Sequence, residues 1–248
     1  MNNFEYLRKT EELYEFVELL RQDTKIKREI TDVAVSKIPY VVYPDLDVNQ
    51  SLIIHEFAEY TLAKAKEENE HNEVAVTYDL DNGLSMKDGF QQIIEKAGVC
   101  YGGLDETNLF SDTQTMSTIY RAKNIAVVNV HNHPGCSSFS VEDISTFLME
   151  SAIKLMVVVG NNGELYYLSK NLPKYNFKEA VRYIAGVSKI IHPDAVPGYK
   201  WKEAELRQCA DIFLKNSNLF GIEYKHVLGT DLELKKIKES KELEISER

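Results

Sequence analysis

The sequence predicts an α/β (α+β) protein, and three observations lead to that prediction. Short apolar runs alternate with segments of helical spacing between about residues 73 and 168. Two of these runs are joined by Asn161-Asn162-Gly163, which is typical of a β-hairpin. Segments with helical spacing flank this region on both sides. We therefore expect three parts: a helical N-terminal extension (1–70), a central domain (71–170) and a helical C-terminal extension (171–248).

Two long helices are expected in the N-terminal extension, at residues 3–22 and 50–70. In both segments apolar side chains recur at the spacing that places them on one face of a helix. The spacing is lost between them, where residues 40–43 form an extended run and Pro44-Asp45 a turn.

Strands and helices are expected to alternate in the central domain. Each expected strand is a short apolar run, and each expected helix has the longer apolar period. The strands are predicted at 73–80, 125–130, 153–159 and 164–168, and the helices at 86–97, 115–123 and 141–151. In the C-terminal extension, helices are predicted at 176–191 and 200–218, followed by a highly charged tail from about Leu232.

The segment from Asn129 to Asp143, N-V-H-N-H-P-G-C-S-S-F-S-V-E-D, contains the most informative residues. His131 and His133 lie two residues apart at the end of a predicted strand, so both imidazoles point to the same side of a sheet. Asp143 follows in the first turn of the next predicted helix, which can bring a carboxylate into the same volume. Two imidazoles and one carboxylate with an open fourth position are typical of a catalytic zinc. The sequence therefore predicts a metal that activates water.

A structural interpretation of the same residues must be weighed. Ser140 suits the N-cap of the predicted helix, and Asp143 is favourable in its first turn. Capping explains these two residues, but it does not explain two histidines that point at them. Cys136 lies in the intervening loop, where it is either a small loop residue or a further contact to the ion.

His-Asn-His-Pro, a loop of small residues and then Ser-x-x-Asp together resemble the motif of the JAMM (MPN+, also called JAB) metalloproteases. The form His-Asn-His-Pro is most similar to the RadC-like and phage- or bacteria-borne JAB branches of that family. The resemblance covers about residues 70–170. It implies a JAMM/MPN-like mixed β-sheet flanked by helices.

The resemblance also implies roles for individual residues. His131, His133 and Asp143 would bind Zn²⁺, and Ser140 would support the oxyanion. The family usually has seven residues between the second histidine and the serine, whereas this chain has six, Pro134 to Phe139. The Ser-x-x-Asp spacing is intact, so we interpret the difference as a shortened loop.

An upstream glutamate is the general base in this family. In RadC-like members it opens a strand that precedes a turn containing aspartate and glycine, and the segment from Glu73 to Gly83 matches that description. We therefore assign the base to Glu73. The competing candidates are Glu70, Glu95 and Glu106, and the alternative interpretation is that Glu73 is only a solvated residue at a strand edge.

A second short pattern is similar to part of another zinc motif. His55-Glu56-Phe57-Ala58-Glu59 begins like His-Glu-x-x-His, but the second histidine is missing. His55 and Glu59 share a helix face at i, i+4. We expect them to form a surface pair without a metal.

Composition narrows the class of protein. A chain of 248 residues can bury a sizeable core, and its three widely separated cysteines fit a reducing, cytoplasmic compartment. No apolar run approaches the ~20 residues of a membrane helix, so no membrane partner is expected. The net charge of −10, from 39 acidic and 29 basic residues, comes without a basic stripe. This lowers the expectation of a nucleic-acid partner.

The resemblance therefore predicts a zinc-dependent hydrolase that cleaves a peptide or isopeptide bond in a protein or peptide, for example a ubiquitin-like conjugate. Two other classes stay open. One is a RadC-like protein that acts on or with nucleic acid, which a phosphodiesterase assay would distinguish. The other is an inactive MPN-type interaction scaffold, which would lack the metal ligands.

Overall fold

The computed structural model describes residues 27–104, 107–193 and 201–228, and a six-stranded mixed sheet forms its centre. The strands are β1 (Val74–Asp79), β2 (Gly98–Tyr101), β3 (Val127–His133), β4 (Ile153–Gly160), β5 (Leu165–Lys170) and β6 (Ile222–Val227). Their order in the sheet is β2-β1-β3-β4-β5-β6. β3 and β4 are parallel, and every other neighbouring pair is antiparallel. The predicted α+β class is confirmed.

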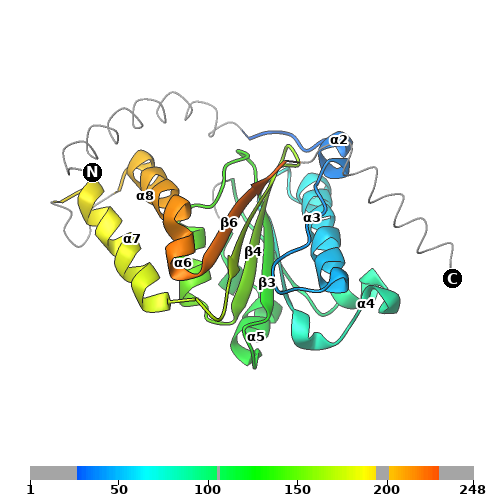
Figure 1. The fold of residues 1–248 in the computed structure, drawn as a ribbon. Coiled ribbons are helices and arrows are strands. Elements are labelled where there is room, and N and C mark those ends of the chain that lie inside the picture. Colours follow the sequence, from blue (N-terminus) through cyan, green and yellow to red (C-terminus); the bar gives the residue numbers. More distant parts are fainter. Residues whose placement is uncertain (1–26, 105–106, 194–200, 229–248) are drawn as a thin grey trace.

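Helices cover both faces of the sheet (Figure 1). They are α2 (Asp32–Ser36), α3 (Val48–Glu68), α4 (Phe90–Ile94), α5 (Thr113–Arg121), α6 (Val141–Met149), α7 (Phe177–Ile191) and α8 (Glu203–Asn216). The 3₁₀ turns are Leu80–Asn82, Met86–Asp88, Leu109–Ser111 and Ser217–Phe220. Within the described ranges, no helix is both long enough and apolar enough to cross a membrane.

Each face of the sheet has its own hydrophobic core, because neighbouring residues of a strand point to opposite faces. On one face, Phe57 of α3 belongs to a cluster that includes Val128 and Val130 of β3. On the other, Phe147 of α6 belongs to a cluster with Val127 of β3 and the inward residues of α7 and α8. Figure 1 shows α3 on one side of the sheet and α6, α7 and α8 on the other. β3 is therefore covered on both faces.

Most predicted elements are present. Helices predicted at 50–70, 115–123, 141–151, 176–191 and 200–218 correspond to α3, α5, α6, α7 and α8, and the four predicted strands correspond to β1, β3, β4 and β5. The predicted helix at 86–97 is wrong in part, because Gly89 at φ +92° separates a 3₁₀ turn from the short α4. The predicted helix at 3–22 and the charged tail lie outside the described residues.

Two strands were not predicted, and both are edges of the sheet. β2 has only four residues, too few for an alternating pattern to be recognised. β6 pairs with β5 although it lies in the extension that was expected to be helical. Edge strands need fewer buried residues than central ones, so their sequences carry a weaker signal. The division at residues 70 and 170 stays a prediction, but α3 and β6 contribute to the same layers as the central region.

The predicted hairpin between β4 and β5 is confirmed. Gly160 N donates to Glu164 O over 2.8 Å, and Gly163 adopts φ +87°. A Cβ at Gly163 would lie 2.3 Å from the carbonyl oxygen of Ala34. The turn therefore requires glycine both for its positive φ and because Ala34 of α2 approaches it closely.

A buried lysine lies at the end of β5. Lys170 is completely buried, and its Nζ donates to Glu150 O over 3.0 Å. The same Nζ lies 4.8 Å from the ring centroid of Phe147 and 5.2 Å from that of Tyr175. Desolvation lowers the pKa of Lys170 from its ordinary 10.5 to about 7. Between these two pH values the unfolded chain binds more protons than the folded protein, so stability rises with pH.

We expect the free energy of unfolding of the wild type to rise relative to that of Lys170→Met between pH 7 and 9, by about 1 kcal/mol per pH unit. The destabilisation caused by burying Lys170 is greatest below about pH 7, and it decreases as the pH approaches 10.5, the pKa of the lysine in the unfolded chain. Urea unfolding at pH 6, 7, 8 and 9 measures this difference. Lys178→Met, which changes an exposed lysine of α7, is the matched control. Parallel pH profiles of the wild type and Lys170→Met would contradict the prediction.

Candidate metal centre

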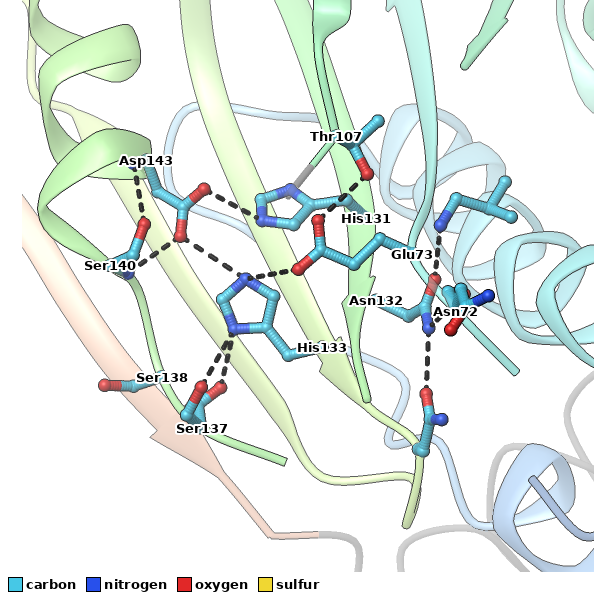
Figure 2. A network of polar contacts seen from close by, with 12 residues as sticks. Asn72, Glu73, Thr107, His131, Asn132, His133, Ser137, Ser138, Ser140 and Asp143 are labelled. Carbon is cyan, nitrogen blue, oxygen red and sulfur yellow. Dashed lines mark hydrogen bonds and ion pairs between the residues drawn. The ribbon is translucent and has the colours of Figure 1, made fainter. Parts of the chain in front are cut away.

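β3 and α6 bring three potential ligands together. His131 and His133 project from β3 toward the first turn of α6, and they are 5% and 6% exposed. His131 Nε2 lies 3.3 Å from Asp143 Oδ1, and His133 Nε2 lies 3.3 Å from Asp143 Oδ2. Figure 2 shows both rings turned toward this carboxylate. The structure therefore brings the three predicted ligands together, the two histidines buried and Asp143 half-buried.

The Nδ1 atoms of both histidines have hydrogen-bond partners on the side away from Asp143. His131 Nδ1 lies 3.0 Å from Asn129 Oδ1, and His133 Nδ1 lies 3.0 Å from the carbonyl oxygen of Ser137. The orientation of the Asn129 amide is itself fixed, because its Nδ2 donates to Thr77 Oγ1 over 3.0 Å. An amide or carbonyl oxygen can only accept, so both Nδ1 atoms carry the proton. In the neutral form of each ring, the Nε2 lone pair would then be available to a cation, as in known metal sites.

These residues fit a metal ion. His131 Nε2 is completely buried and has no hydrogen-bond partner among the described residues. A buried polar atom without a partner is unfavourable, and coordination would satisfy it. One potential ligand atom each from His131, His133 and Asp143 lies within 4.8 Å of the others. Cys136 does not belong to this group; it is half-buried at φ +57° in the turn after His133.

The charges of the group depend on one another. Burial alone would raise the pKa of Asp143, but the facing imidazoles of His131 and His133 hold it well below its usual range. Burial would likewise lower the pKa of His133, but Asp143 and Glu73 raise it to about 9. Near neutral pH the metal-free group therefore has an anionic Asp143 beside a protonated His133, and a divalent cation would bind by displacing that proton.

Glu73 lies beside the ligands. It is 6% exposed, so it is not a solvated residue at a strand edge. Its Oε1 is 3.9 Å from His133 Nε2, and its Oε2 accepts a hydrogen bond from Thr107 Oγ1 over 2.9 Å (Figure 2). Burial raises the pKa of Glu73, although His133 and His131 partly oppose the increase. A carboxylate with a raised pKa beside a metal group is suited to accept a proton.

The competing glutamates lie elsewhere. Glu70 is exposed at φ +50°, in the turn before β1. Glu95 is exposed at the end of α4, where it accepts from Gln91 Nε2 over 3.1 Å. Glu106 lies outside the described residues. Among the candidates that the structure describes, Glu73 is the one placed beside the histidines.

Ser140 is the N-cap of α6. Its Oγ accepts from Asp143 N over 3.0 Å, and its own backbone N donates to Asp143 Oδ2 over 2.7 Å. This reciprocal pair is a capping box, which fixes the Asp143 side chain as well as the helix terminus. The capping role is therefore present despite the shortened loop. The role of Ser140 toward an oxyanion stays a prediction.

His55 belongs to a separate pair. Its Nε2 lies 3.4 Å from Glu59 Oε1, as the i, i+4 spacing predicted. The expected surface location of His55 is wrong, since the residue is buried in α3. His55 is buried because it lies in α3, which packs against the sheet, although histidine as a residue type is often exposed.

Four supporting residues were not predicted. They are Asn129, Asn132, Ser137 and Thr107, which contact the ligands, Glu73 or its neighbours. A signal existed for the two asparagines, because they are polar residues in a strand that the sheet buries along its whole length. Ser137 and Thr107 lie in loops and have no comparable signal.

Comparisons of the chain with protein-family models, curated proteins and solved structures find no match. The chemistry of the site is therefore inferred from its own geometry.

We expect the protein to bind one divalent metal ion per chain and the double variant His131→Ala/His133→Ala to lose that binding, because two of three ligands are removed. At a free metal concentration of about 100 times Kd, binding should stabilise the wild type by about 2.7 kcal/mol. Isothermal titration calorimetry and thermal unfolding with and without a chelator measure the two effects.

His226→Ala is the matched control for this experiment, because His226 is exposed on β6. It should bind the metal as the wild type does. A chelator-treated wild type that binds none of the divalent transition metals would contradict the assignment of the site.

Proposed function

We propose that the protein is a zinc-dependent hydrolase of the JAMM type, which cleaves a peptide or isopeptide bond. One observation carries the proposal: two buried imidazoles and a half-buried carboxylate have a further, buried carboxylate, Glu73, 3.9 Å from one ligand nitrogen. The three ligands suit zinc with an open position. The second carboxylate supplies the general base that hydrolysis requires.

Glu73, Thr107 and Ser140 have different roles in the proposed reaction. When bound, zinc supplies Lewis acidity and lowers the pKa of water from 15.7 to about 7. Glu73 takes the proton of the attacking water and delivers it to the leaving amine. Thr107 holds Oε2 of that glutamate, which leaves Oε1 directed toward His133. The Ser140 oxygen accepts from Asp143 N, so its hydroxyl proton can be donated to the developing oxyanion.

The arrangement of β3, α6 and β4 supports a ligand site at these residues. α6 connects two parallel strands, and its N-terminus approaches the carboxyl end of β3. In open sheets that contain parallel strands, ligands bind at this edge. The substrate we propose is a protein or peptide, for example a ubiquitin-like conjugate, since a chain of net charge −10 lacks the basic footprint of a nucleic-acid enzyme.

The decisive variant is Glu73→Gln, which should lower turnover by about 10²- to 10⁴-fold while zinc remains bound, because the amide cannot accept the proton of the water. Fluorescent casein tests a peptide bond, and an isopeptide-linked diubiquitin tests an isopeptide bond. Glu70→Gln is the matched control, since it changes an exposed glutamate three residues away. Mass spectrometry of the metal in each purified protein confirms that zinc is retained.

Several outcomes would contradict the proposal. Two histidines and one carboxylate also form the ligand set of iron(II) oxygenases, so iron in place of zinc would overturn it. Cleavage of bis(p-nitrophenyl) phosphate without cleavage of either protein probe would show a phosphodiesterase. Full activity of Glu73→Gln would assign the base to another residue.

Ser140→Ala separates catalysis from capping. If Ser140 donates to the oxyanion, turnover should fall by about 10²-fold or more with an unchanged KM, since that hydrogen bond strengthens in the transition state. Loss of the cap alone should cost about 1 kcal/mol of stability and leave turnover near normal. Asn176→Ala removes the N-cap of α7 and serves as the matched control. Turnover and urea unfolding are compared for both variants.

A further inference from the structure

Asn132 lies between the two histidines in β3 and points away from them (Figure 2). It is completely buried. The regular pairing of β1 with β3 ends at Ala75 and His131, one position before Asn132. Beyond that point the Asn132 side chain continues the connection, because its Oδ1 accepts from Val74 N over 2.7 Å. Near the His131–His133–Asp143 group, a side-chain hydrogen bond thus takes the place of the backbone hydrogen bonds between β1 and β3.

The nitrogen of the Asn132 amide bonds to the residue that precedes Glu73. Asn132 Nδ2 donates to the carbonyl oxygen of Asn72 over 3.2 Å and to Asn161 Oδ1 over 2.8 Å. Asn72 and Val74 are the two chain neighbours of Glu73. The backbone N and O of Glu73 itself pair with Gly103 O and Gly102 N on the β2 side. From the β3 side, which carries both histidines, one buried amide holds the two residues that flank Glu73.

A second amide supports the first. Asn161 Nδ2 donates to Arg28 O over 2.7 Å and to His71 O over 3.0 Å. The turn that it contacts is unfavourable by itself, since Glu70 and His71 both have positive φ values, +50° and +64°. Such conformations persist where surrounding contacts determine them, and they are found often at functional sites.

We propose that Asn132 is a positioning residue for Glu73: it fixes the distance of the Glu73 carboxylate from the His131–His133–Asp143 group. This inference rests on the proposed function. If Asn132 were apolar, Val74 N and the Asn72 carbonyl would lose their buried partner, and the chain at Glu73 would shift to find others. Displacement of a catalytic group by about 1 Å can cost about 10²-fold in rate.

The first test is amide hydrogen exchange of the full-length protein without added metal. Asn132→Leu has a side chain of similar size and removes all three hydrogen bonds. The Val74 amide should exchange at least 10-fold faster in Asn132→Leu, after correction for the change in global stability. Leu214→Ala, which removes packing of α8 on the sheet face opposite to Asn132, supplies that correction. An equally protected Val74 amide in Asn132→Leu would overturn the inference.

The second test is a double-mutant cycle with zinc bound, on the casein and diubiquitin probes. Asn132→Leu should lower kcat by about 10²-fold with unchanged KM, and it should cause no further loss in the Glu73→Gln background, because it acts through that residue. Independent losses that multiply would overturn the inference. If the wild type binds zinc but cleaves neither probe, the hydrolase proposal fails, while the exchange of Val74 still decides whether Asn132 holds the backbone of Glu73.

Discussion

The half-buried Asp143 carboxylate is the constraint on which the site depends. A carboxylate removed from water is strongly unfavourable unless charges and hydrogen bonds compensate it. Here one oxygen accepts from Ser140 N and both oxygens face histidine Nε2 atoms. A divalent cation bound among the same three side chains would compensate the carboxylate further and satisfy His131 Nε2. The site is thus prepared for positive charge by the surroundings of one acidic residue.

The topology provides these surroundings through the β3–α6–β4 unit. Because β3 lies inside the sheet and is paired on both sides, its two histidines cannot turn away to solvent. Because α6 connects β3 to a parallel neighbour, its N-terminus returns to the carboxyl end of β3, and a carboxylate in that first turn is favoured by the helix dipole. Asp143 therefore belongs to the capping box with Ser140 and, at the same time, is one of the three residues that could hold a metal ion.

Buried amides connect the site to distant parts of the chain. Asn129 orients His131, whereas Asn132 and Asn161 tie β3 to the turn before Glu73 and to Arg28. Buried polar side chains are retained where every hydrogen bond is made, and such networks make the structure rigid. The residues before α2 thus contribute to the frame of the site, although nothing in their own sequence suggested this.

The sequence alone determined what depends on short spacing. The i, i+2 relation placed His131 and His133 on one face, and the helix start at Ser140 placed Asp143 near them, because a strand and a helix each have a fixed period. The same periodicity predicted α3 and α6, and the turn residues Asn161-Asn162-Gly163 predicted the hairpin. The resemblance already favoured Glu73 over Glu70, but only the tertiary structure places Glu73 beside the histidines, because this placement depends on the pairing of β1 with β3 across more than fifty residues. The tertiary structure likewise determined the edge strands β2 and β6 and the contacts of Thr107 and Asn132. These features depend on contacts between segments that lie far apart along the chain, so no short sequence pattern predicts them.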